Sequence, residues 1–153
     1  MKRSIAVEII SLLFTLLFLY TGISKLSDYN VFKEQIALSP LPESLAPRIA
    51  WGLPRIELLL ALLLFIPRWR LKALYASLSL MLLFTGYIIA TAHNKEDILC
   101  NCGGILEQMS FTEHIIFNSI FLLLAVFGIL LEKQLKKQKI LTWKTLEKTA
   151  NLA

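Results

Sequence analysis

Four long apolar stretches, separated by shorter polar segments, dominate the pattern of the chain. They cover residues 5–23, 49–66, 73–92 and 115–131. A helix rises about 1.5 Å per residue, so about 20 apolar residues cross the roughly 30 Å of hydrocarbon in a bilayer. The third stretch carries no charge and meets this length, whereas the fourth needs its flanking residues. The pattern predicts an all-α protein with a membrane domain over residues 1–131, folded as an up-down four-helix transmembrane bundle.

The second stretch is the least regular of the four. Residues 58–66 are fully apolar but too short to cross a bilayer, and the extension back to residue 49 includes Pro54, Arg55 and Glu57. Pro54 has no N–H to donate to the carbonyl four residues before it, so we expect a bend or a helix start there. The second span is therefore predicted to enter the membrane in a broken or kinked form.

The first stretch follows Lys2 and Arg3, as the apolar region of a secretory signal peptide does. It is longer than a typical signal-peptide region, and no Ala-x-Ala cleavage site follows it. We therefore expect a retained membrane helix.

Two segments outside the spans have patterns of their own. In residues 24–48, Ser27 or Asp28 can cap a short helix that runs through Leu38, after which prolines break the chain. This segment is predicted to be a helical loop across the outer mouth of the bundle. In residues 132–153, apolar side chains alternate with lysines, which predicts a basic amphipathic helix at the inner membrane surface; a frayed, solvated tail is the alternative.

Composition and charge support the membrane class and set the topology. The chain is 56% hydrophobic and only 18% charged, unlike a typical soluble domain. Its net charge of +5 does not indicate nucleic acid, because most basic residues flank apolar stretches and suit lipid headgroups. Eleven of the 16 basic residues fall on the side of the two termini. The positive-inside rule then places both termini in the cytoplasm of a bacterial inner membrane.

The two cysteines lie in the outward segment before the fourth stretch, in the sequence Cys100-Asn101-Cys102-Gly103-Gly104. Disulfides persist outside the cytoplasm. Extended residues two apart are about 7 Å apart at Cα, so a bridge needs the tight turn that Asn101, Gly103 and Gly104 permit. Such a bridge would be strained and exchange-prone, and its short ring makes it a poor staple. Redox activity is the favoured interpretation, with a structural staple and metal binding as the alternatives.

Metal binding requires more ligands than the two cysteines. His93 and His114 flank the cysteine segment, but the spacing matches no zinc signature, although a soft cysteine pair suits copper. A histidine near a span end is more often an interfacial polar residue. We therefore predict no metal site.

Glu57 is the second candidate for function, because an ionisable group inside a membrane segment is costly. Its expected partners are Lys25, at the outward end of the first stretch, and Arg55, two residues away on a different helix face. Lys25 and Glu57 should lie at similar depth on adjacent antiparallel helices. Such a pair can hold two helices in register or move protons.

Three motifs in this order resemble those of a known family, the four-span DoxX-like proteins, and most closely its methylamine utilisation protein MauE branch. They are Gly22-Ile23-Ser24-Lys25-Leu26, Leu53-Pro54-Arg55-Ile56-Glu57 and Cys100-Asn101-Cys102-Gly103-Gly104. The resemblance covers roughly residues 10 to 130. Family members usually read Cys-Gly-Cys-Phe-Gly in the third motif, from which Asn101 and Gly103 depart.

The resemblance implies a four-helix membrane bundle and thiol redox chemistry in the periplasm, beside thioredoxin-like proteins. Some wider relatives look like subunits of quinone-reducing enzymes, although this sequence has no quinone-binding signature. The leading hypothesis is a thiol-disulfide relay through Cys100 and Cys102, passing electrons to or from a carrier such as quinone. The alternatives are a non-enzymatic assembly or maturation factor and a protein that handles metals or small solutes.

Overall fold

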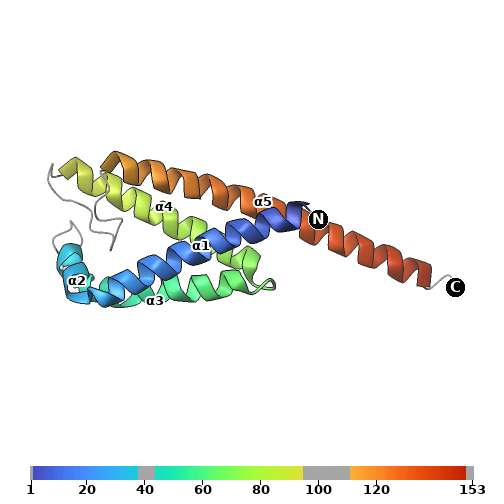
Figure 1. Ribbon diagram of the computed structural model, residues 1–153, viewed down its shortest axis with the longest axis horizontal. Coiled ribbons are helices and arrows are strands. Elements are labelled where there is room, and N and C mark those ends of the chain that lie inside the picture. The colour runs from blue at the N-terminus through green and yellow to red at the C-terminus, as the bar shows by residue number, and fades with distance from the viewer. Residues whose placement is uncertain (1, 38–43, 95–110, 151–153) are drawn as a thin grey trace.

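The computed structural model of the protein describes residues 2–37, 44–94 and 111–150 (Figure 1). These residues form helices and short turns, and no strand occurs among them, so the all-α prediction is confirmed. The helices are α1 (Lys2–Ser27), α2 (Tyr29–Ala37), α3 (Ala46–Phe65), α4 (Arg70–Asn94) and α5 (Phe111–Ala150).

Four of the helices lie alongside one another (Figure 1). Helix α1 packs against α3 and α5, while α4 packs against α5 and α3. Helix α4 ends and α5 begins at the end of the molecule that α2 occupies (Figure 1). We call this the α2 end of the molecule.

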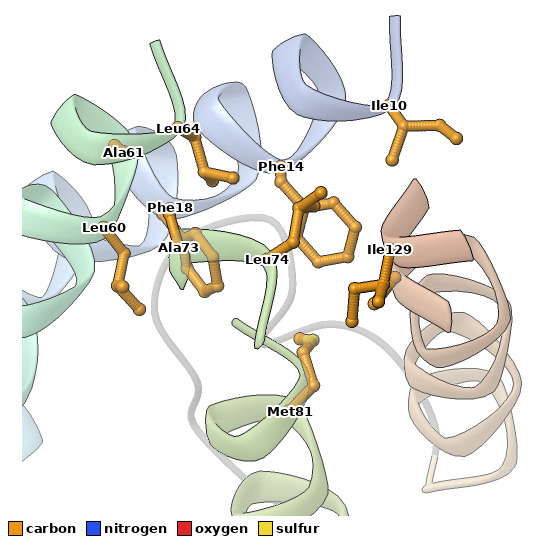
Figure 2. Close-up of a cluster of buried hydrophobic side chains, with 11 residues drawn as sticks. Ile10, Phe14, Phe18, Leu60, Ala61, Leu64, Ala73, Leu74, Met81 and Ile129 are labelled. Carbon is orange, nitrogen blue, oxygen red and sulfur yellow. The ribbon is translucent and has the colours of Figure 1, made fainter. Parts of the chain in front are cut away.

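A single apolar core joins these four helices. Phe14 and Phe18 from α1 meet Leu64 from α3 and Leu74 from α4, and all four side chains point toward one another (Figure 2). The ring of Phe14 also meets Phe121 of α5 edge-on, with 5.2 Å between the ring centroids. All the side chains of this core are apolar, so they can be exchanged for others of similar volume at little cost.

The outer faces of the helices are also apolar. Leu62, Leu83 and Leu123, for example, are 60%, 70% and 72% exposed. Water-soluble proteins rarely expose so many large apolar side chains, so these faces suit contact with lipid. Among the described residues, three helical segments are long and apolar enough to cross a membrane: Arg3–Ser27, Arg70–Ala90 and Thr112–Thr145. The protein is therefore a multi-pass membrane protein.

Helix α3 differs from these three because Arg48, Arg55 and Glu57 interrupt it, and its crossing of the membrane stays a prediction. Of the two outcomes predicted at Pro54, a bend or a helix start, the helix start is wrong. The helix begins at Ala46 with Pro47 in its first turn, where a missing N–H forfeits no helical hydrogen bond, and it continues through Pro54.

The helix predicted between the first two spans is α2. Its side chains Phe32 and Ile36 pack on Ala46 and Ala50 at the start of α3, in a small apolar cluster separate from the main core. This contact fixes α2 beside the end of α1 that carries Lys25.

Helix α5 does not end where its predicted span ends at residue 131. Its 40 residues correspond to about 60 Å, and its C-terminal part projects beyond the other helices (Figure 1). The segment after Glu132 is helical up to Ala150, whereas its position at the membrane surface stays a prediction.

Candidate functional site

A buried ion pair joins α1 to α3. The Nζ atom of Lys25 donates to Oε1 of Glu57 at 2.5 Å, and the two residues are only 4% and 1% exposed. Both charges are therefore removed from solvent, and each depends on the other for compensation. The structure thus brings together the two residues that the sequence singled out on separate helices.

Backbone proximity between α1 and α3 makes this contact possible. A Cβ atom added to Gly22 would lie 3.2 Å from the carbonyl oxygen of Pro54 and 3.2 Å from the side chain of Leu58. Glycine lets the helices approach this closely without a shift of the neighbouring atoms by a few tenths of an ångström. The close approach lies one turn from both charges, so the motif around Gly22 and the motif around Pro54 meet in space.

A small cavity of about 40 Å³ lies beside the ion pair. All four packed helices contribute to its lining, which contains polar groups from α1, α3 and α5 and aromatic or sulfur-containing side chains from α1, α4 and α5. The lining residues are Leu17, Phe18, Thr21, Lys25, Glu57, Met81, Phe84, His114, Phe117 and Asn118.

Helix α5 supplies two of the polar groups. His114 and Asn118 are 6% and 3% exposed and lie four residues apart, so they occupy the same face of the helix. The Nδ2 atom of Asn118 and the Oε2 atom of Glu57 are buried without a hydrogen-bond partner among the described residues. Each therefore retains unused hydrogen-bonding capacity inside the molecule.

Thr21 does not supply the missing donor for Glu57. Its hydroxyl donates to the carbonyl oxygen of Leu17 at 3.0 Å, and a hydroxyl has only one proton to donate. The second carboxylate oxygen of Glu57 is thus left open beside the cavity.

Aromatic rings complete the surroundings of Lys25. Its Nζ atom lies 4.8 Å from the ring centroid of Phe84 on α4 and 5.6 Å from that of Phe32 on α2. Ring faces attract a cation, so both rings are suitable neighbours for the ammonium group of Lys25. Five helices thus meet around one ion pair.

Arg55 lies apart from this site. It is exposed, its Nη1 atom donates to the carbonyl oxygen of Trp51, and its guanidinium carbon lies 3.8 Å from the centroid of the Trp51 ring. The structure therefore does not bring Arg55 to Glu57, which lies on another face of α3.

The predicted cysteine site lies outside the described residues. This applies to Cys100 and Cys102 and to Asn101, Gly103 and Gly104 around them. His93 belongs to the last turn of α4. Within the parts of the chain that the structure describes, no three His, Cys, Asp or Glu side chains gather as a metal site would require.

Sequence reasoning missed the contribution of α5 to the site. The sequence pattern assigns no role to Asn118 or Thr21, and it predicts His114 to be an interfacial polar residue. A signal did exist, because an amide within an otherwise apolar membrane helix usually faces a polar partner.

Comparison with known proteins gives one match. The family model of methylamine utilisation protein MauE matches residues 3–131. No curated protein and no solved structure matches the chain. The matched range includes the ion pair, the cavity and the cysteine segment, and it ends where α5 leaves the other helices.

Proposed function

Because the chain belongs to the family of methylamine utilisation protein MauE, we propose that it is a membrane thiol-disulfide relay. In this proposal Cys100 and Cys102 exchange disulfides with a thioredoxin-like protein in the periplasm. The wider kinship with DoxX-like proteins, which rests on the three motifs, is part of the same proposal.

One observation carries this proposal beyond the sequence. The segment with the two cysteines begins after Asn94, at the end of α4, and ends before Phe111, at the start of α5. These two helices pack together and present both attachment points at the α2 end of the molecule (Figure 1). Sixteen residues separate the two helices, and both attachment points of this segment lie at the end of the molecule that holds the buried ion pair.

The chemistry is a pair of sulfur exchanges. The thiolate of one cysteine attacks the disulfide of the partner, forming a mixed disulfide and releasing one partner thiolate. The second cysteine then attacks the mixed disulfide, which forms the Cys100–Cys102 bond and releases the partner as a dithiol. Two electrons pass to the partner, and the same steps in reverse return them. A quinone has the two-electron chemistry needed to exchange electrons with the cysteine pair within the membrane.

The topology belongs to the proposal. We place both termini in the cytoplasm, α3 as a fourth span and the cysteine segment in the periplasm. Support for α3 comes from its outward face, where Leu59, Leu62 and Phe65 are more than half exposed and suit lipid contact. A membrane-impermeant thiol reagent should label the reduced cysteines once the outer membrane is opened. Labelling only after rupture of the inner membrane would reverse the topology.

Trapping tests the relay itself. Replacing the resolving cysteine by alanine leaves the mixed disulfide with nothing to resolve it, so a partner adduct should accumulate on a non-reducing gel and be identified by mass spectrometry. Replacing the attacking cysteine should abolish the adduct. The relay fails if neither Cys100→Ala nor Cys102→Ala yields an adduct while the double variant still supports growth of the host.

A second candidate is a non-enzymatic assembly or maturation factor. The observation that favours it is the Lys25–Glu57 pair, which joins α1 to α3 and suits a rigid scaffold. Full function of the double cysteine variant would support this candidate. Stoichiometric metal in the wild type, lost in that variant, would instead favour metal handling.

A further inference from the structure

The cavity beside the ion pair has properties that a structural ion pair does not require. A pair that only held α1 to α3 would be most stable with every remaining polar atom satisfied and no space beside it. Here Oε2 of Glu57 and Nδ2 of Asn118 have no partner among the described residues, and both residues line the same space of about 40 Å³. An acceptor on α3 and a donor on α5 are thus left open toward one cavity.

The size of the cavity limits its occupant. A buried water needs about 10–15 Å³ of such space and two to four polar partners. The cavity therefore accommodates roughly one to three waters. A quinone ring is several times too large. Its lining is mostly apolar, but its five polar residues distinguish it from a purely apolar cavity of similar size, which would stay dry.

The charges around the cavity suggest what the water does. The titratable groups that face it are Lys25 from α1, Glu57 from α3 and His114 from α5, whereas α4 contributes only Met81 and Phe84. Lys25 and Glu57 neutralise each other. An imidazole and a carboxylate oxygen that share one small cavity can exchange a proton through a water between them.

We propose that this cavity is a hydrated proton-exchange site, in which one to three waters bridge Glu57 Oε2 to Asn118 Nδ2. Once the imidazole of His114 has gained a proton, it transfers this proton to the bridging water. At the same time, the water transfers another proton to Oε2 of Glu57. One N–H bond breaks, one carboxyl O–H bond forms, and the imidazole becomes neutral. Asn118 is a positioning residue, because it holds the water and carries no proton through the exchange.

Two other buried polar atoms lack partners within the described part of the chain, and they provide a contrast. Ser11 Oγ and Arg70 Nε do not line this cavity. Of these four atoms, only those of Glu57 and Asn118 belong to residues that line this cavity, where a water can be their partner. The inference goes beyond the thiol relay and stands without it, since none of its residues belongs to the cysteine segment.

Radiolytic hydroxyl labelling tests the water. Ionised water oxidises the side chains next to it, so Phe84 and Phe117 should be labelled several-fold more than Phe121, which is half-buried like them but packs against the apolar core. The measurement uses the full-length wild type in lipid nanodiscs and needs no variant. Equal labelling of the three rings would show a dry cavity and overturn the proposal.

Infrared difference spectroscopy tests the proton. Acidification of the wild type should produce a buried carboxyl or imidazole band that Glu57→Gln or His114→Gln removes. The Asn118→Leu variant should slow the exchange of this band in D₂O roughly tenfold, the effect of about 1.4 kcal/mol on a barrier. Ser119→Ala, which alters the neighbouring exposed hydroxyl, should leave the rate unchanged. Unaltered exchange in Asn118→Leu, or a wild-type spectrum equal to that of the Glu57→Gln, His114→Gln double variant, would refute the site.

Discussion

The apolar core around Phe14 and Leu74 and the polar cavity around Lys25 and Glu57 are built by the same four helices. In the core every helix contributes side chains that lipid would accept equally well. In the cavity, α1, α3 and α5 each contribute a group that lipid rejects, while α4 contributes an aromatic ring that faces the lysine. The two regions therefore contribute to the fold in different ways.

The difference follows from the solvent. Lipid tails are as apolar as leucine, so burying an apolar side chain between membrane helices gains mainly packing contacts. A charged side chain in hydrocarbon is different, because it is costly unless a partner of opposite charge lies beside it. In the observed packing of α1 on α3, Lys25 meets Glu57. The core thus fills the space between the helices, while the ion pair favours the observed packing of α1 on α3.

Breaking the ion pair should have the largest effect on stability. Glu57→Gln leaves a buried ammonium without its counter-charge, and Lys25→Met leaves a buried carboxylate, so each should lower the free energy of unfolding by about 3–5 kcal/mol. The double variant should recover part of this loss because it buries no unpaired charge. Titration with SDS in mixed micelles measures all three.

Arg55→Met is the matched control, since it removes an exposed charge two residues from Glu57 that contacts Trp51 and not the pair. It should change stability by no more than about 0.5 kcal/mol. Additive losses in the Glu57→Gln, Lys25→Met double variant would mean that the ion pair does not favour the packing of α1 on α3.

The same comparison explains what could be predicted from the sequence. Length and apolar character alone predict α1, α4 and α5, because a membrane span is a property of one segment. The meeting of Lys25 and Glu57 also follows from local information, since adjacent antiparallel helices put their equivalent ends at one depth. Arg55 was misplaced as a partner, because two residues along a helix turn a side chain to another face.

The contribution of α5 could not be predicted in this way. His114 and Asn118 reach the cavity only through the rotation of α5 about its axis and its packing on α1 and α4. Those are properties of three helices together, and no periodicity within α5 determines them. The helix start expected at Pro54 failed for a related reason, because contacts with α1 and α2 outweigh the loss of one hydrogen bond in α3.

A core substitution should have a smaller effect than the ion-pair variants. Leu74→Ala removes a fully buried side chain. In the unfolded state this leucine lies in lipid and not in water, so the variant loses packing contacts but no hydrophobic transfer free energy. We expect a loss of about 2 kcal/mol, the lower end of the range for soluble cores. Leu83→Ala on the same helix, at a site 70% exposed, should be close to neutral. SDS titration of both variants checks the contrast, and a Leu74→Ala loss matching that of Glu57→Gln would remove the distinction between the two regions.

The smallest predicted effect tests the close approach that brings the two charges together. In Gly22→Ala the new methyl group would lie 3.2 Å from the Pro54 carbonyl, which cannot move freely, and from Leu58, which can. Overpacking of this kind should lower the free energy of unfolding by about 1 kcal/mol. Gly86→Ala is the matched control: nothing lies within 4 Å of its added methyl, so the better helix propensity of alanine should make that variant neutral or up to about 1 kcal/mol more stable. SDS titration measures the change in the free energy of unfolding for both variants. A loss in Gly22→Ala with a gain in Gly86→Ala would show that the tight contact between α1 and α3 opposes the methyl group. A gain in both variants would mean that these two helices separate at no cost.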